Sequence, residues 1–405
     1  MRLDPRSNAW MNEPAIEILF QAFAEAGGEA RFVGGAVRDA LLGRAVGDVD
    51  FAATLSPEAV SSILRAKGFK VVPTGIEHGT VTAVFAHKSY EITTLRKDIA
   101  TDGRHATVAY TDRWEEDAQR RDFTINALFA DKDGALFDYV GGLKDLEAGV
   151  LRFIGDPAAR IEEDHLRILR FFRFYAQLEH EGKPFDLDNA ALSACGEKAS
   201  LLGSLSIERI GHELRKLLGG VFVAQAWDAL TQKNLPPFLL PEAQNLSRLK
   251  QICSLSENRN ERRWLRNLAS LLDEKSEDNR SIFQRLRFSK AETEHLLALQ
   301  SSLRAIGSGL TLPKAKKIAY RFGKEPLLDA LIVFSAHEKK ALQVWMDVQK
   351  WDVPTFPLRG ADILDRGLSE GPLLGKKLQE IEDWWIENEF AADRNACLAE
   401  LAKRV

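Results

Sequence analysis

The sequence contains few cysteines and no long hydrophobic run. Cys195, Cys253 and Cys397 are the three cysteines among 405 residues, and no two of them form a C-x-x-C pair. This scarcity argues against a disulfide framework or a thiolate zinc site and is typical of a reducing cytoplasm. No apolar stretch approaches the roughly 18–20 residues that a membrane-spanning helix needs. Residues 1–11 also lack the layout of a secretory signal. We therefore expect a cytoplasmic protein without a membrane segment.

A strong excess of either charge is also lacking. The formal net charge is −4, although 28% of the residues are charged. Any nucleic-acid function would therefore have to depend on local basic surfaces. Hydrophobic residues make up 45% of the chain, which is enough for ordinary folded cores. At about 100–200 residues per domain, the length predicts two to four domains.

The character of the sequence changes near residues 145–155. Before this point, glycines and short β-like runs alternate with helical stretches; residues 79–95 suggest a hairpin and residues 56–67 a helix. After it, long amphipathic helical patterns dominate. Prolines punctuate these patterns near residues 235–237 and 351–357. The sequence thus predicts an N-terminal part with strands and helices, followed by a mostly helical remainder.

The densest chemical signal lies in residues 32–51. A short strand leads into Gly34 and Gly35, and a helix follows that ends at Gly43. Glycines at a helix start let a ligand approach the backbone, and free N–H groups there favour an anion such as phosphate. Arg38, one turn into the helix, could add a forked donor to the same phosphates.

Carboxylates follow this helix. Asp48 and Asp50 are two residues apart in a β-like segment, so their side chains leave the same face. Such a pair suits Mg²⁺, which prefers oxygen ligands and completes its shell with substrate phosphates and water. Two acids at this spacing are by themselves an ordinary surface feature, and the preceding glycines and Arg38 favour the nucleotide site. Glu91, on a strand that could neighbour this segment, either completes the carboxylate set or is a polar strand residue.

Residues 34–51 resemble the signature of class II tRNA nucleotidyltransferases and bacterial poly(A) polymerases, within the polymerase-β nucleotidyltransferase superfamily. Further segments match this family in the expected order. Residues 120–127 (RRDFTINA) resemble its ribose- and triphosphate-contacting block, residues 138–146 its connector between head and neck, and residues 163–174 its base-reading neck helix. A weaker block lies at residues 206–214.

This resemblance implies a mixed α+β fold with a nucleotidyltransferase head, built on a small mixed sheet with helices, followed by an all-helical neck, body and tail. It implies that Asp48, Asp50 and Glu91 are catalytic and that Asp48 and Asp50 hold Mg²⁺ as cofactor. The residues expected to bind the nucleotide are Gly34, Gly35, Arg38, Arg121, Asp122, Asn126, Asp164, Arg167, Arg170 and Arg173. The predicted segments are a catalytic head (1–150), a nucleotide-selecting and RNA-binding neck (151–220), a tRNA-binding body (221–350) and a tail (351–405).

In the neck, Asp164 and Arg167 are three residues apart and are expected to project together from one helix face. A carboxylate accepts and a guanidinium donates hydrogen bonds, which supplies both polarities needed at a Watson–Crick-like base edge. C and A both present an exocyclic amine beside a ring nitrogen, so one pair could select both. Without the preceding motifs, the same spacing would indicate a surface ion pair.

The resemblance implies template-independent addition of C, C and A to the 3′ end of tRNA, with CTP and ATP as substrates and no obligate protein partner. Residues 73–82 look like the CCA-adding type rather than a poly(A) polymerase. Residues 96–110 resemble the loop associated with the final A addition, which argues against a CC-only enzyme. An A-only enzyme, a poly(A) polymerase and a catalytically inactive RNA-binding protein are the alternatives, and intact Asp48 and Asp50 argue against the last.

The helical half contains two groups of cations that could contact tRNA. Such groups can bind RNA phosphates without reading sequence, although a run of charge can equally be a solvated helix face. We expect Lys314, Lys316, Lys317 and Arg321 to contact the RNA, with Lys324 nearby. The second group contains Arg262, Arg263, Arg266, Arg285 and Arg287.

Overall fold

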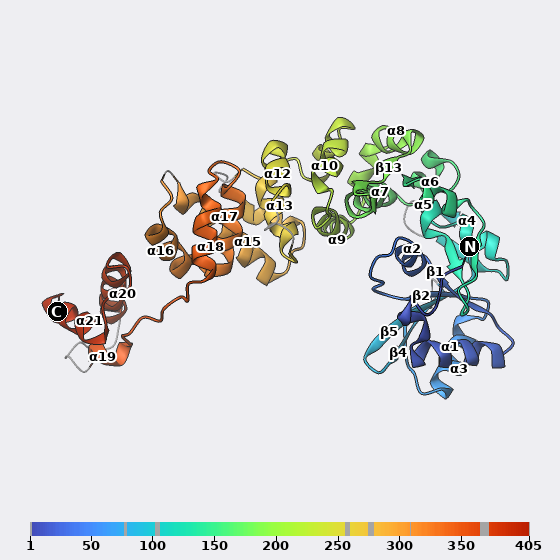
Figure 1. Cartoon of the computed structure of the whole chain (residues 1–405), viewed down its shortest axis with the longest axis horizontal. Helices are drawn as coiled ribbons and strands as arrows, with labels where there is room; N and C mark the ends of the chain where they lie inside the picture. Colours follow the sequence, from blue (N-terminus) through green and yellow to red (C-terminus); the bar gives the residue numbers. More distant parts are fainter. Residues whose placement is uncertain are drawn as a thin grey trace. The chain divides into compact units, whose positions relative to one another are not determined.

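The structure is a computed structural model that describes residues 2–76, 79–101, 106–255, 260–273, 279–307, 309–364 and 372–404. These residues form two compact units, Met1–Leu240 and Pro241–Val405 (Figure 1). Part of the loop predicted to assist A addition, residues 102–105, lies outside the described ranges. Within those ranges, no helix combines the length and apolar character needed to cross a membrane.

A seven-stranded mixed sheet forms the head of the first unit, in the order β3-β4-β5-β2-β1-β8-β9. β2 and β5 pair in parallel, whereas the other neighbouring strands pair antiparallel. The predicted mixed α+β class is confirmed. The strands of this sheet are β1 (Ala30–Val33), β2 (Asp50–Ala53), β3 (Lys70–Gly75), β4 (Thr80–Phe85), β5 (Lys88–Thr94), β8 (Leu128–Ala130) and β9 (Leu136–Asp138).

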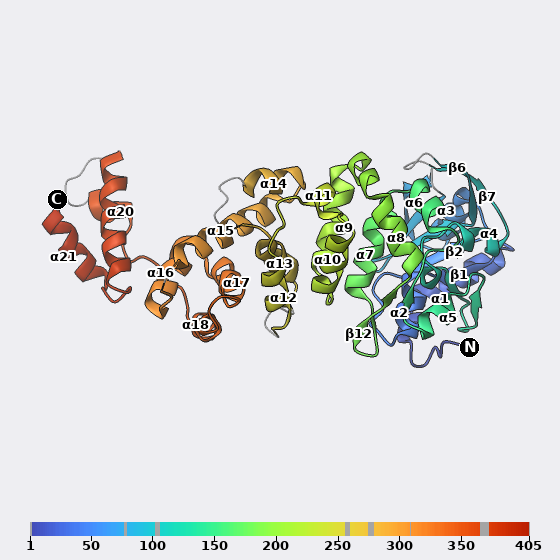
Figure 2. The ribbon, with the colours of Figure 1, turned by 90° about the horizontal axis from the view of Figure 1, so that it is seen from above.

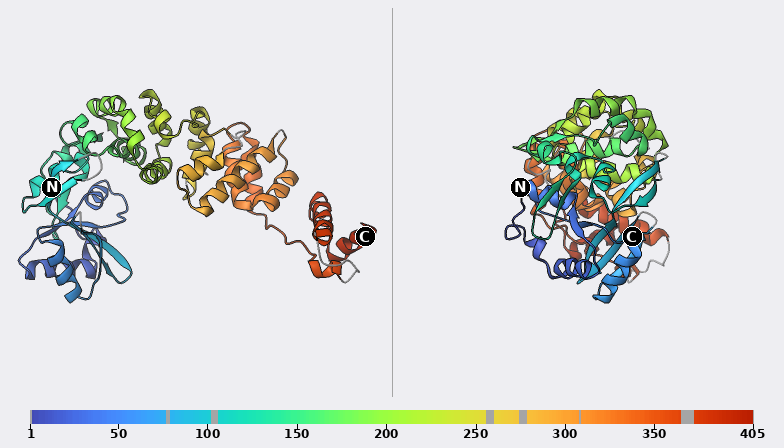
Figure 3. Two further views of the ribbon diagram at one scale, coloured as in Figure 1. Left: turned by 180° about the vertical axis from the view of Figure 1, so that it is seen from behind. Right: turned by 90° about the vertical axis from the view of Figure 1, so that its right-hand side faces the viewer.

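Local sequence signals explain several elements of the head. The predicted hairpin is confirmed: β4 and β5 are joined through Ala86 and His87, both at positive φ, as in a type I′ turn. The predicted helix at 56–67 is α3 (Pro57–Ala66), and its N-cap Ser56 accepts a hydrogen bond from the Ala59 N–H. α3 packs against β4 and against α1 (Pro14–Glu25), which lies beside it (Figures 1 and 3).

Helices dominate the rest of the first unit (Figure 2), but the neck is not all-helical as predicted, because it also contains three two-residue strands between residues 179 and 187. α7 packs against α9 and α10, so the segment just beyond residue 220 belongs to the same unit as the neck. The other elements of this unit are η1 (Ala9–Asn12), α2 (Gly35–Leu41), β6 (Arg96–Thr101), β7 (Ala106–Tyr110), α4 (Trp114–Gln119), η3 (Thr124–Asn126), α5 (Gly142–Glu147), β10 (Val150–Leu151), α6 (Pro157–Glu163), α7 (Arg167–Gln177), β11 (Glu179–His180), β12 (Lys183–Pro184), β13 (Asp186–Leu187), α8 (Asn189–Glu197), η4 (Ala199–Ser204), α9 (Ile207–Leu218), α10 (Val223–Gln232) and α11 (Pro236–Leu239).

An aromatic cluster joins the head to α7 inside the first unit. Phe123, which follows the RRD segment, lies 4.8 Å from Phe153 and 5.3 Å from Phe174 between ring centroids. Phe153 in turn stacks on Phe171 at 5.4 Å. Offset and edge-to-face pairs of this kind add to the stabilisation from burial. The cluster thereby fixes α7 against the segment that carries Arg121, Asp122 and Asn126.

The second unit is helical. Its larger core is built mainly from α15 to α18, and a smaller one, which includes Trp385, joins α20, α21 and the preceding segment. Tyr320 of α16 lies 5.6 Å from Trp385 of α20, so the two cores are in contact. The helices are α12 (Leu246–Cys253), α13 (Arg263–Leu271), α14 (Asn279–Arg285), α15 (Lys290–Ile306), α16 (Leu312–Phe322), α17 (Lys324–Phe334), α18 (Lys340–Gln349), α19 (Gly360–Leu364), α20 (Pro372–Glu387) and α21 (Arg394–Arg404).

Candidate active site

A pocket of about 610 Å³ in the first unit collects the predicted nucleotide-site residues. All ten residues expected to bind the nucleotide line it, and so do Asp48 and Asp50. They come from the β1–α2 turn, the start of β2, the segment around η3, and α7 with the residues just before it. Glu91 is not among the lining residues. Segments far apart in the sequence thus meet in one polar pocket.

The turn into α2 requires glycine at its first position. Gly34 has φ 71° and ψ −122°, a conformation that residues with a side chain rarely adopt. A Cβ atom there would lie 3.6 Å from the Asn126 carbonyl oxygen and 3.9 Å from Nη1 of Arg121. These are ordinary contact distances, so the backbone conformation and not a lack of space favours glycine at this turn.

The acidic residues lie at and around the N-terminal end of β2, in the interior of the sheet and beside this turn. Asp50 is the first residue of β2 and pairs in register with Glu91 of β5, whereas Asp48 lies in the bend before the strand. Burial raises the pKa of Asp50 to about 6, and the charges of Glu91 and Asp48 act in the same direction, opposed by Arg121. The site thus holds crowded negative charge that a divalent cation would relieve.

A divalent cation fits these donors only with help from a substrate. Among the described residues, no three histidine, cysteine or acidic side chains converge as a metal-binding group. Asp48 and Asp50 could supply two carboxylates, and the pocket has room beside them for phosphates. Mg²⁺ is commonly bound in this way, through one or two carboxylates with water and substrate phosphates.

A hydrogen-bonded network connects α2 to α7 across the floor of the pocket. Arg38 Nη1 donates to the Asn126 side-chain oxygen at 2.6 Å, and Asn126 Nδ2 donates to Asp122 Oδ1 at 3.1 Å. Arg170 Nε donates to Asp122 Oδ2 at 2.8 Å. Burial alone would raise the pKa of Asp122, but the Arg170 guanidinium and these hydrogen bonds hold it well below its usual value. Asp122 therefore stays ionised and orients both Arg170 and Asn126.

Asp117 of α4 holds the two arginines that follow it. Its Oδ1 accepts from Nε and Nη2 of Arg120 at 2.8 and 2.6 Å, and its Oδ2 accepts from Nε and Nη2 of Arg121 at 3.1 and 2.8 Å. The Asp117 side chain is fully buried, with 0% of the residue exposed. Two forked pairs on one carboxylate fix the direction of both guanidinium groups. Arg121 thus enters the pocket from a rigid support.

The base-reading pair predicted from the sequence is arranged differently. Helix α6 ends at Glu163 and α7 begins at Arg167, so Asp164 lies in an extended break between them. Asp164 accepts from Nη2 of Arg209 at 2.9 and 3.0 Å. Arg167 donates instead to Glu163 at 2.6 Å. The expected projection from one continuous helix is therefore wrong, because the chain turns at Asp164, yet both residues line the pocket.

Comparisons with known proteins agree with this geometry. The sequence model described as "Poly A polymerase head domain" matches residues 30–152, and that described as "Probable RNA and SrmB- binding site of polymerase A" matches residues 184–246. The mouse protein named CCA tRNA nucleotidyltransferase 1, mitochondrial, is 34% identical over 96% of this chain and 90% of its own length. The CCA-adding enzyme of Streptococcus gordonii is 34% identical over 97% of both chains. The chain belongs to the family of class II tRNA nucleotidyltransferases and bacterial poly(A) polymerases.

A solved structure of the family extends this likeness to the whole fold. The Bacillus stearothermophilus CCA-adding enzyme in complex with CTP superposes with a TM-score of 0.80 at 28% identity, covering 97% of this chain and 98% of that one. The family resemblance carried by the sequence motifs is thereby confirmed.

Sequence reasoning missed two residues of this nucleotidyltransferase that hold pocket side chains. Asp117 lies three and four residues before Arg120 and Arg121, a spacing that places one acid next to two cations on a helix. That signal was available in the sequence. Arg209 is 45 residues from Asp164, so only the packing of α9 on α7 reveals their contact.

The cations predicted to bind RNA lie on and near α16 and have intramolecular partners. Lys317 pairs with Glu387 at 2.6 Å and Arg321 with Asp383 at 3.2 Å, both on α20. Lys314 Nζ donates to the Ile306 carbonyl at 2.6 Å. Lys316 lies 5.5 Å from the centre of the Trp351 ring. Their role in RNA binding stays a prediction.

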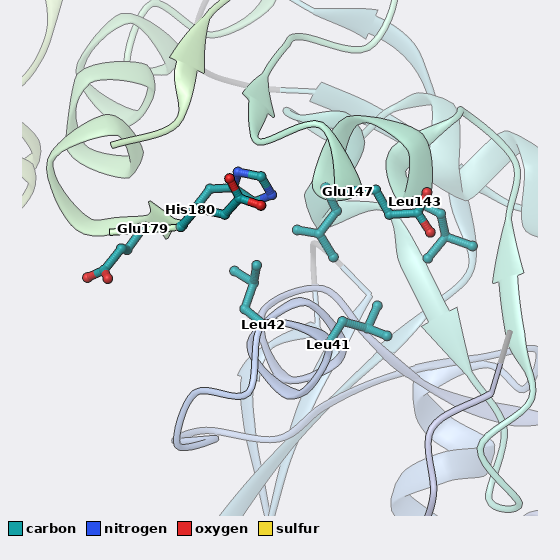
Figure 4. A pocket seen from close by; sticks show the side chains of 8 residues that line it. Leu41, Leu42, Leu143, Glu147, Glu179 and His180 are labelled. Atoms are coloured by element: carbon teal, nitrogen blue, oxygen red, sulfur yellow. The ribbon is translucent and has the colours of Figure 1, made fainter. Parts of the chain in front are cut away.

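A second pocket in the first unit, of about 340 Å³, contains none of the predicted site residues. Leu41 and Leu42 at the end of α2 face Leu143 and Glu147 of α5, with His180 at one side (Figure 4). Its lining is leucine with a glutamate rim, which is unsuited to a triphosphate. The larger polar pocket is therefore the candidate active site.

Proposed function

We propose that this protein adds C, C and A to the 3′ end of tRNA, using CTP and ATP and releasing pyrophosphate. The observation that carries the proposal is the polar pocket that unites an acid pair, a glycine turn and six arginines of the family motifs. The CCA-adding proteins that this chain matches over nearly their full length support the same reaction.

We propose that Asp48 and Asp50 hold Mg²⁺, with Glu91 beside Asp50 as a third acid. When bound, the ion would supply charge stabilisation to the triphosphate and would lower the pKa of the attacking 3′-hydroxyl. Raised to about 6, the pKa of Asp50 still leaves the carboxylate mostly ionised at neutral pH. Asp50 can therefore bind a cation at neutral pH mostly without first losing a proton.

The remaining residues bind and orient the nucleotide. Arg38 and Arg121 donate to the phosphates beside the Gly34–Gly35 turn, and the network around Asp122 fixes the ribose side of the pocket. Asp164 and Arg167 supply an acceptor and donors for the edge of C or A. Such a reaction needs no covalent intermediate, because phosphoryl transfer depends mainly on positioning and charge stabilisation.

The deciding experiment offers CTP and ATP separately to tRNA that ends at the discriminator base, at −C and at −CC. A CCA-adding enzyme extends the first two substrates with CTP and the third with ATP. An A-only enzyme extends only the −CC substrate, and a poly(A) polymerase adds several A residues to any of them. An inactive RNA-binding protein extends none. We also propose a cytoplasmic location, which the scarcity of cysteine supports.

A further inference from the structure

A small pocket in the second unit brings together parts of both predicted basic groups. It has a volume of about 140 Å³ and is lined by Arg262 and Arg266 beside and on α13, Lys324 of α17 and Trp345 of α18, among others. The pocket is small against the 610 Å³ of the candidate active site. A single phosphate group therefore suits it better than a whole nucleotide does.

The floor of this pocket is an internal ion cluster. Asp329 is 1% exposed and accepts from Arg266 Nη1 at 2.7 Å, and its second oxygen lies 3.2 Å from Arg262 Nε and 2.7 Å from His295 Nε2. Arg262 also pairs with Glu325. The two carboxylates thus compensate the two arginines and hold them in place.

Lys324 adds a positive charge to this pocket that no carboxylate of the lining neutralises. Its Nζ donates to the Trp351 carbonyl oxygen at 2.6 Å, and no acidic side chain of the described chain lies within ion-pair distance of it. Charged groups in the lining are then Arg262, Arg266 and Lys324 against Glu325 and Asp329, a net charge of +1. The indole Nε1 of Trp345 is buried and has no hydrogen-bond partner among the described residues. The pocket offers one uncompensated cation and an unused neutral donor.

We propose that this pocket binds one phosphodiester of the tRNA backbone. A phosphodiester carries a single negative charge and strong acceptor oxygens, which match the charge of Lys324 and the donor of Trp345. The inference rests on the proposed function, because it identifies a site that binds the backbone of the tRNA substrate. Free inorganic phosphate has the same chemistry, and the experiment separates the two sources.

The test measures the dissociation constant of full-length protein for tRNA ending in −CC across a range of KCl concentrations. Lys324→Gln should weaken binding about threefold to tenfold at low salt and lower the log–log salt slope by about 0.7–0.9, because one phosphate contact is lost. Trp345→Phe should weaken binding about threefold without changing the slope, because it removes a neutral donor and keeps the ring. Lys324→Arg should retain the slope. Lys340→Gln removes an exposed cation of α18 and is the matched control, expected to leave binding unchanged.

A second arm adds inorganic phosphate at constant ionic strength. Phosphate should compete with tRNA for the wild-type protein and compete less with Lys324→Gln. Unchanged tRNA binding and slope in both variants would overturn the proposal, and phosphate-dependent thermal stabilisation that Lys324→Gln abolishes would then assign the pocket to free phosphate. A wild-type protein that binds tRNA but extends none of its ends would refute the proposed function instead.

Discussion

Several arginines of the candidate active site have acidic partners, and so do two cations of α16, Lys317 and Arg321, but the partners differ in burial. Asp117 and Asp122 are 0% and 8% exposed. The partners of α16, Glu387 and Asp383, have side chains that are 66% and 48% exposed. Buried partners fix the geometry of a cation and are costly to remove, whereas exposed pairs contribute little and exchange readily with other anions. The same residue types are therefore rigid parts of the candidate active site in one unit and exposed surface charge in the other.

The largest effect is expected where no partner can replace the lost group. Asp50→Ala should lower the incorporation of both C and A by about a thousandfold or more, because a bound metal supplies several kcal/mol of transition-state stabilisation. Asp48→Ala should behave alike. Single-turnover rates with saturating tRNA measure this, and tRNA binding should be largely retained. Asp133→Asn, at an exposed acid of the same unit, is the control. A variant that keeps more than about a tenth of the wild-type rate would contradict the metal assignment.

Removal of the Asp117 carboxylate tests directly whether a buried acidic partner fixes the arginines of the candidate active site. Asp117→Asn should lower kcat/KM for CTP by about 10- to 100-fold, mostly through KM, because Arg120 and Arg121 lose their shared carboxylate. It should also lower the free energy of unfolding by about 3–5 kcal/mol, the typical cost of removing one partner of a buried ion pair. Steady-state kinetics and urea unfolding give the two numbers. Glu115→Gln on the same helix is exposed and should change neither. A stable Asp117→Asn protein with normal KM would show that the Asp117 carboxylate does not position Arg121.

The Asp164 contact predicts a change in nucleotide choice. Asp164→Ala should slow the addition of C and A about tenfold to 100-fold and permit U or G at the tRNA 3′ end, because a base amine loses its acceptor. Incorporation of each nucleotide alone measures this. Since Arg209 holds both carboxylate oxygens, Arg209→Gln should shift selectivity in the same direction by a smaller factor. If both variants are slower but equally strict, selection resides elsewhere in the pocket.

A pH titration distinguishes Asp50, whose pKa is raised by neighbouring carboxylates, from Asp122, whose pKa is lowered by Arg170. The pKa of Asp50 is raised to about 6 by burial and by the charges of Glu91 and Asp48, so protons compete with the metal as pH falls below that value. The apparent Mg²⁺ affinity should drop about tenfold per pH unit below 6 and be nearly constant above 7. Magnesium dependence of the rate at several pH values measures this. Glu91→Gln should move the midpoint downward, because it removes one of the raising charges. An unchanged midpoint would show that the charge of Glu91 does not affect the titration of Asp50.

The smallest effects are expected on α16. Replacement of Lys314, Lys316 and Lys317 together by Gln should weaken tRNA binding a few-fold and lower the log–log salt slope by about one. Most of this should come from Lys314 and Lys316, because no carboxylate of the described residues pairs with either, whereas Lys317 already pairs with Glu387. Stability should change by about 1 kcal/mol or less. An unchanged slope would show that the cluster is an ordinary solvated face.

The sequence was sufficient to predict the parts of the site that are contiguous in the chain. The glycine turn with Arg38, the acid pair and the RRD segment each combine a local backbone signal with residue chemistry, and all line the pocket. Short-range patterns also predicted the β4–β5 hairpin and α3 correctly.

Contacts between distant segments could not be predicted in this way. The resemblance of residues 163–174 to a neck helix and the spacing of Asp164 and Arg167 suggested one continuous helix. Such a pattern does not reveal the break of three residues that begins at Asp164. Arg209 reaches Asp164 only because α9 packs on α7. Likewise, a basic pattern on α16 gives no sign of the acidic helix α20 beside it.

The pairing of Asp122 with Arg170 has a consequence for how the protein is synthesised. The two residues are 48 positions apart, and Arg170 is made after the whole of the sheet. At about 5–20 residues per second, the ribosome leaves Asp122 without its guanidinium for about 2–10 seconds. During that interval Asp117 already has both of its arginines, so the part of the pocket around Arg121 can form before the part around Arg170. A truncated chain that ends at residue 150 would lack Arg170 and would leave Asp122 without this partner.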